Sequence, residues 1–117
     1  MILIVDDSAF SRKATRKIFE KLGHPVAEAD GVSQALSMLA ENDYQFVLTD
    51  LLMPGLDGFD LLAKVDQVRR VPVAVLTCDV QHSNVQRCMD LGAVAVIHKP
   101  VDETKLAEVI ELVLAAR

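Results

Sequence analysis

Residues 46–58 read FVLTDLLMPGLDG, and this stretch decides how the rest of the chain is interpreted. Its first four residues are apolar or β-branched, which is typical of a strand buried on both faces. The run stops at Asp50, and Met53, Pro54 and Gly55 then favour a turn. A carboxylate at the end of a buried strand costs free energy unless a partner compensates it. Asp50 alone could simply cap a loop, so the rest of the chain has to decide its role.

The composition predicts a single aliphatic domain that spans residues 1–117. The chain is 51% hydrophobic but only 4% aromatic, and it has no Trp. Its net charge of -5 argues against direct binding to nucleic acid, which requires a clustered basic surface. No apolar run is long enough to cross a bilayer, and Ile2 already belongs to the first predicted strand. Cys78 and Cys88 have no metal-site spacing, so we expect reduced thiols in a soluble, cytoplasmic protein without a membrane partner.

Strand and helix patterns alternate along the chain. Short apolar runs predict strands over residues 2–5, 25–29, 46–50, 72–77 and 93–97. Apolar residues at helical spacing predict helices over residues 9–22, 33–41 and 83–91, and two more after Gly58 and Asp102. Ser8 is placed to cap the first helix and Gly23 to end it. Five strands that alternate with five helices over short connections predict an α/β fold, with helices on both faces of a parallel sheet.

Polar residues stand where four of the predicted strands end. Asp6 and Asp7 end the first strand, Asp50 the third, Thr77 the fourth and Lys99 the fifth. In a parallel sheet these ends lie along one edge, where open α/β sheets bind ligands. Two carboxylates about 4 Å apart repel by roughly 4 kcal/mol at an effective dielectric constant of 20. We therefore expect either a protonated carboxyl group or a cation among the three acidic side chains.

The predicted cluster fits phosphoryl transfer with Mg²⁺. Hard oxygen ligands in an open site suit this ion best. An incoming oxyanion near Asp50 would meet the metal, the Lys99 ammonium and the Thr77 hydroxyl, which together neutralise its charge. Asp50 would then be the nucleophile, because aspartyl phosphates are an established covalent intermediate.

The residues at the strand ends resemble those of response-regulator receiver domains of two-component signalling, most closely the single-domain chemotaxis type. The motifs that carry the resemblance are VDDS at residues 5–8, DLLMPGLDG at 50–58, VLT at 75–77 and KP at 99–100. The resemblance implies a flavodoxin-like, doubly wound sheet of five parallel strands in the order 2-1-3-4-5. It also implies a regulatory phosphoacceptor domain that catalyses only its own phosphotransfer and dephosphorylation, and is not an enzyme with a separate substrate.

The resemblance further implies roles for particular residues. Asp50 would accept a phosphoryl group from a histidine kinase, a phosphotransfer protein or a small donor. Thr77 and Lys99 would contact the phosphoryl oxygens, and the Lys99–Pro100 bond would be cis. The surface of the fourth helix, fifth strand and fifth helix would change and bind a downstream output protein. The implied Mg²⁺ ligands are Asp7, Asp50 and the Leu52 carbonyl, with Asp6 assisting through water.

Three positions depart from the family pattern. Val96 stands where the family usually has Tyr or Phe, so a ring-flip switch cannot operate here. Leu52 and Asp79 occupy the two positions that flank the attacking water in the family, which leaves the phosphoryl lifetime open. Because of Val96, the alternative function is a receiver-like protein-interaction module that works without phosphorylation.

The first predicted helix carries two further features. Phe10 is either exposed, where it could dock a kinase helix, or part of the core. Its apolar stripe is predicted to be Ala14, Ile18 and Leu22. One side of the helix is basic and is predicted to be a solvated face; its residues are Arg12, Lys13, Arg16 and Lys17.

Overall fold

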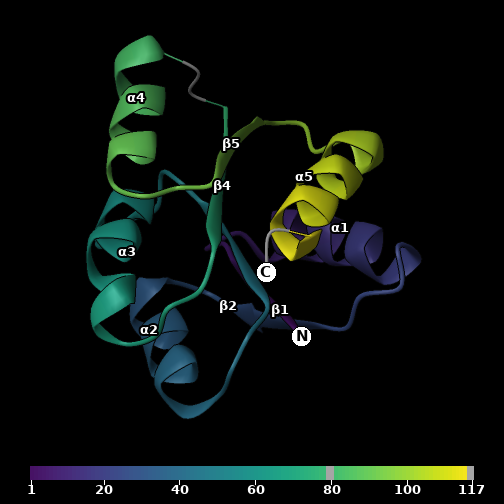
Figure 1. Ribbon diagram of the computed structural model, residues 1–117, viewed down its shortest axis with the longest axis horizontal. Helices are drawn as coiled ribbons and strands as arrows, with labels where there is room; N and C mark the ends of the chain where they lie inside the picture. The colour runs from purple at the N-terminus through teal and green to yellow at the C-terminus, as the bar shows by residue number, and fades with distance from the viewer. Residues whose placement is uncertain (79–80, 116–117) are drawn as a thin grey trace.

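The structure is a computed structural model that describes residues 1–78 and 81–115. Strands and helices alternate along the chain (Figure 1). The elements in order are β1 (Ile2–Val5), α1 (Ala9–Lys21), β2 (Val26–Ala29), α2 (Val32–Glu41), β3 (Phe46–Asp50), α3 (Gly58–Lys64), the short 3₁₀ helix η1 (Val65–Gln67), β4 (Val73–Thr77), α4 (His82–Asp90), β5 (Ala95–His98) and α5 (Glu103–Ala115).

The strands form one parallel sheet in the order β2-β1-β3-β4-β5. Helices α1 and α5 lie on one face, and α2, α3 and α4 lie on the other (Figure 1). The predicted flavodoxin-like fold is thereby confirmed, including the strand order that the family resemblance implied. No helix in the described ranges combines the length and the apolar character that a bilayer crossing requires.

Each face of the sheet has its own aliphatic core. Successive side chains of a strand point to opposite faces, so Ile2 and Ile4 pack with α1 and α5. Leu3 and Val5 pack on the other face with α2 and α3. This two-sided burial explains why the strands read as continuous apolar runs.

Side-chain caps fix the helix ends near the carboxyl edge of the sheet. The Ser8 hydroxyl accepts a hydrogen bond from Ser11 N at 3.2 Å, which begins α1 as predicted. Asp102 accepts a hydrogen bond from Thr104 N at 2.7 Å and begins α5. Gly23, with φ of 87°, adopts the left-handed conformation that ends α1.

The predicted apolar stripe of α1 is confirmed for Ile18 and Leu22, which are partly buried and pack against the core, and is wrong for Ala14, which is exposed. Thr15 and Phe19, which the prediction left out, are the fully buried residues of this stripe. Thr15 can be buried because its hydroxyl donates to the Ser11 carbonyl at 3.1 Å. Ala14 and Ile18 line an open groove, so part of the apolar side of α1 is left uncovered.

Candidate functional site

Three carboxylates meet at the carboxyl edge of the sheet. Strands β1 and β3 are neighbours with Val5 paired to Thr49, so the residues that follow them come together. One oxygen atom from each of Asp6, Asp7 and Asp50 lies within 4.8 Å of the others. Asp6 is buried, Asp50 is half-buried and Asp7 is exposed. The acidic cluster therefore has a closed inner side and an open outer side.

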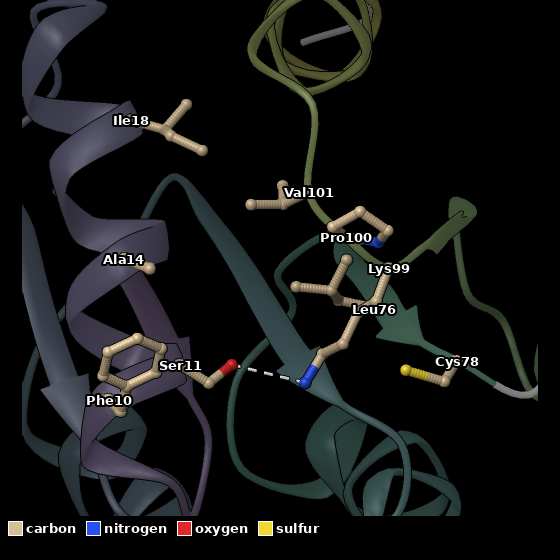
Figure 2. Close-up of a pocket in the computed structure, with 9 residues that line it drawn as sticks. All are labelled: Phe10, Ser11, Ala14, Ile18, Leu76, Cys78, Lys99, Pro100 and Val101. Carbon is tan, nitrogen blue, oxygen red and sulfur yellow. Dashed lines mark hydrogen bonds between the residues drawn. The ribbon is translucent and has the colours of Figure 1, made fainter.

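Lys99 reaches this cluster from the end of β5. Its Nζ lies 3.4 Å from Asp50 Oδ1 and 3.9 Å from Asp6 Oδ2. The same ammonium group donates a hydrogen bond to Ser11 Oγ at 3.3 Å (Figure 2). The Lys99–Pro100 peptide bond is cis, as the resemblance implied.

The alternation of side chains along the strands explains this convergence. Ile4, Leu48 and Ile97 all pack on the face of the sheet covered by α1 and α5. The residues two positions later are Asp6, Asp50 and Lys99, and a period of two returns them to the same side. The side chains on this face are therefore apolar within the sheet and charged at its carboxyl edge, where Asp6, Asp50 and Lys99 lie.

The cluster carries more negative charge than Lys99 can balance. Three carboxylates against one ammonium leave a formal charge of -2, which matches a divalent cation. Burial raises the pKa of Asp50 above its usual range; Lys99 opposes this effect and Asp6 adds to it. Even with Lys99 beside it, the Asp50 carboxylate is therefore less favourable in its charged form than in water, and a nearby cation would stabilise that form.

The three carboxylates fit Mg²⁺ in chemistry and in size. Mg²⁺ takes oxygen ligands at about 2.0–2.1 Å, so opposite ligands are roughly 4 Å apart. The oxygen atoms of Asp6, Asp7 and Asp50 span little more than this. Movements of less than about 1 Å would bring all three within reach of one ion.

The remaining predicted site residues lie around this cluster. Thr77 is buried at the end of β4, and its carbonyl accepts a hydrogen bond from Lys99 N at 2.9 Å. Leu52 follows β3 with its side chain 58% exposed. Val96 pairs with Val75 on β4 and packs against the α2–α3 core. Asp79 lies outside the described residues.

Two polar residues of α1 belong to the site and were missed as functional residues in the sequence. Ser11 accepts the hydrogen bond of Lys99, and no sequence signal pointed to it. The prediction of a solvated face is wrong for Arg12, because its side chain is only 16% exposed and donates to the Asp6 carbonyl at 2.7 Å. A signal for it existed in Glu28, because a charged residue inside a strand of a buried sheet needs a partner.

An apolar groove borders the site between α1 and the β5–α5 connection (Figure 2). Phe10, Ala14 and Ile18 form its α1 side, and Pro100 and Val101 form the opposite side. The Phe10 side chain is 88% exposed, which settles the question left open by the sequence. Lys99, which contacts Asp50, also lines the groove, so the groove lies next to the acidic cluster.

Residues 2–111 match the response regulator receiver domain family. The chain is 37% identical over 112 residues to the sensory/regulatory protein RpfC of Xanthomonas campestris pv. campestris; the match covers 92% of this chain but only 15% of RpfC. It is 33% identical over 111 residues to the chemotaxis protein CheY-3 of Vibrio cholerae, covering 92% of this chain and 85% of CheY-3. Its fold is similar to a chain of the CheX–CheY–BeF₃–Mg²⁺ complex from Borrelia burgdorferi, with a TM-score of 0.89, 27% identity, and coverage of 96% of this chain and 87% of that chain. The chain therefore belongs to the response regulator receiver domains of two-component signalling.

Proposed function

We propose that this receiver domain is a phosphorylation-activated switch in which Asp50 accepts the phosphoryl group. One observation carries the proposal: three carboxylate oxygens converge within 4.8 Å while Lys99 lies 3.4 Å from Asp50. A cluster of this kind is unfavourable on its own and becomes favourable when a metal and an anion complete it. The proposed Mg²⁺ ligands are Asp6, Asp7, Asp50 and the Leu52 carbonyl.

The proposed transfer step is a nucleophilic substitution at phosphorus. A carboxylate oxygen of Asp50 forms the new O–P bond as the bond between phosphorus and the donor breaks. The electron pair of that bond leaves with the donor, which is an imidazole nitrogen of a phosphohistidine or the acetate of acetyl phosphate. Lys99 and Thr77 contact the phosphoryl oxygens and hold the group in line with Asp50.

Bound Mg²⁺ would neutralise the charge that the carboxylates and the phosphoryl group bring together. The likeness to a complex that contains CheY, BeF₃ and Mg²⁺ supports this choice of metal. The chain's own residues prepare the site. Asp50 Oδ1 accepts a hydrogen bond from Leu51 N at 3.1 Å, and Asp6 Oδ1 accepts one from Ser8 N at 2.9 Å. Both contacts orient the carboxylates before any ligand arrives.

The apolar groove beside Lys99 supports a protein as the phosphodonor. Phe10 and Ala14 are exposed on α1, and the groove between them and Pro100 leads to the Lys99 ammonium. We assign this groove to a helix of a histidine kinase or phosphotransfer protein, whose phosphohistidine would then face Asp50.

The surface of α4, β5 and α5 is the proposed output face, where a downstream protein would bind. Exposed apolar side chains lie along these elements, among them Met89 on α4 and Leu112 on α5. Since Val96 supplies no ring to move with Thr77, the backbone after Thr77 would carry the change to α4. Phosphorylation adds about two negative charges, which is enough to alter local pairing.

Intact-mass spectrometry after incubation with acetyl phosphate tests the proposal. With Mg²⁺, the wild-type chain should gain the mass of one phosphoryl group, and without Mg²⁺ the gain should be strongly reduced. Asp50→Asn should show no gain under either condition. This variant keeps nearly the same side-chain size but replaces the carboxylate by an uncharged amide, which is not a nucleophile toward phosphorus.

Two outcomes would contradict the proposal. A wild-type chain that gains no mass in Mg²⁺ would favour an interaction module that works without phosphorylation. A gain that persists in Asp50→Asn would place the acceptor on another residue.

A further inference from the structure

We propose that Arg12 is a positioning residue that fixes the peptide bond between Asp6 and Asp7, and through it the Mg²⁺ affinity of the site. The inference rests on the proposed function, because it concerns the metal that this function requires. Arg12 does not touch the metal ligands' side chains; it contacts the backbone that aims them.

The guanidinium group of Arg12 joins three elements of the fold. From α1, Nη1 donates to the Asp6 carbonyl at 2.7 Å, at the end of β1. Nε donates to Glu28 Oε1 on β2, also at 2.7 Å. Glu28 is held a second time by Arg16 of the next helical turn. Two planar donors in fixed relative positions thus tie the end of β1 to the neighbouring strand.

Asp7 depends on its backbone for its position. Asp6 is fixed several times: its N–H donates to the Ala29 carbonyl at 3.1 Å, and its carboxylate accepts from Ser8 N. In the described part of the chain, no hydrogen bond or ion pair holds the exposed Asp7 side chain. The backbone at the Asp6–Asp7 peptide therefore sets the position from which the Asp7 side chain starts, and Arg12 holds the carbonyl of that peptide.

The burial of this contact indicates that it is rigid. The side chains of Arg12 and Glu28 are 16% and 19% exposed, in contrast to the 39% of Arg16. Partly buried, charge-assisted hydrogen bonds are stronger than exposed ion pairs, which contribute little. Residues that orient metal ligands without binding the metal commonly change metal affinity by about 10-fold to 100-fold when they are replaced.

Mg²⁺ titration of three variants by isothermal calorimetry tests the proposal. Arg12→Gln removes one positive charge and the pair of guanidinium donors, Nε and Nη1, that contact Glu28 and the Asp6 carbonyl. Arg16→Gln is the matched control, because it removes the same charge from the same helix and from Glu28 but touches no backbone of the site. Arg12→Lys keeps the charge and the aliphatic stem but cannot reproduce that pair of donors.

A positioning role and a purely electrostatic role of Arg12 predict opposite changes in the Mg²⁺ dissociation constant of Arg12→Gln. If Arg12 acted only through its charge, its removal would tighten Mg²⁺ binding, since a cation is repelled less. We expect the dissociation constant of Arg12→Gln to rise about tenfold, that of Arg12→Lys to rise several-fold, and that of Arg16→Gln to stay within about twofold of wild type. In labelling by acetyl phosphate, Arg12→Gln should need more Mg²⁺ but reach the wild-type rate at saturation.

The results separate this inference from the proposed function. Wild type that takes up no Mg²⁺ would overturn the proposed function. Wild type that binds Mg²⁺ while Arg12→Gln and Arg12→Lys bind it equally well or more tightly would overturn only the role of Arg12. An equal loss in Arg16→Gln would also overturn it, because the loss would then reflect general destabilisation. Thermal unfolding without Mg²⁺ shows whether each variant is folded; if Arg12→Gln is not, Arg12→Lys decides the question.

Discussion

Gly58 is the residue at which a single added methyl group should disturb the site most directly. It is the first residue of α3, and its N–H donates to the Leu51 carbonyl at 2.8 Å. A Cβ atom at this position would lie 2.8 Å from the Asp50 carbonyl oxygen and 2.9 Å from Leu51 Cα. Both atoms belong to the backbone, so a rotamer change cannot relieve the overlap. Gly58→Ala must move the end of β3, which carries Asp50.

The size of the effect follows from two opposing contributions. Alanine in a helix is favoured over glycine by roughly 0.5–1 kcal/mol, which alone would stabilise the variant. Overpacking against rigid atoms costs about 1–3 kcal/mol. The difference is a net loss of at most about 2.5 kcal/mol, with about 1 kcal/mol as the central expectation, and at roughly 3–6 °C per kcal/mol for a domain of this size the Tm should fall by about 3–6 °C. Mg²⁺ affinity should fall as well, because Asp50 and the Leu52 carbonyl shift with the backbone.

Circular dichroism melting without Mg²⁺ and calorimetric Mg²⁺ titration measure these two effects. Gly31→Ala is the control: a Cβ atom there meets nothing within 4 Å, and φ of -177° suits any residue. It should cost a little stability as a poorer helix cap but leave Mg²⁺ affinity unchanged. A Gly58→Ala variant with wild-type Tm and wild-type Mg²⁺ affinity would refute the reasoning.

Three further predictions concern other parts of the molecule. Hydrogen bonds from Arg16 and then Arg12 lower the pKa of Glu28, so ionised Glu28 stabilises the fold above its unfolded pKa of roughly 4.3, and this contribution is lost as the pH falls through the lower folded value. Glu28→Gln should therefore melt lower than wild type at pH 7, and thermal scans at successively more acidic pH should show the difference shrink. Arg69 donates hydrogen bonds to the Leu39 and Ala40 carbonyls at the end of α2. Urea unfolding of Arg69→Met should therefore show a free energy of unfolding lower by about 1–2 kcal/mol. Asp43→Ala removes only an exposed ion pair with Arg69 and should lower it by less than about 0.5 kcal/mol. If apolar Leu52 shields the acyl phosphate, Leu52→Asn should lose its phosphoryl group faster in a dephosphorylation time course, and an unchanged or slower rate would remove that hypothesis.

Much of the fold was predictable because the pattern is local. Runs such as residues 2–5 and 46–50 are strands buried on both faces, and the first and last helices begin at side-chain caps, Ser8 and Asp102. The acidic residues and Lys99 could be placed at one edge because parallel strands end on the same side. The strand order was different: it came from the resemblance to a family, since the residues alone only permit β1 and β3 to be neighbours.

The exact edge of the buried stripe of α1 could not be predicted from the sequence. A helical period that includes Ile18 and Leu22 can be extended to Ala14 or to Thr15, and only packing against the sheet shows that Thr15 is buried and Ala14 is exposed. Phe10 is exposed as well, beside the groove that Lys99 also lines.

The sequence by itself determined which residue types end each strand, and therefore that carboxylates, a hydroxyl and an ammonium group share one edge of the sheet. Only the tertiary structure decided which of them touch, and that Arg12 turns inward to the Asp6 carbonyl and Glu28. The physical reason is the separation in sequence over which each interaction acts. Strand and helix periods depend on neighbours a few residues away, whereas the contact between Arg12 and Glu28 joins residues 16 positions apart and exists only once α1 is packed on the sheet.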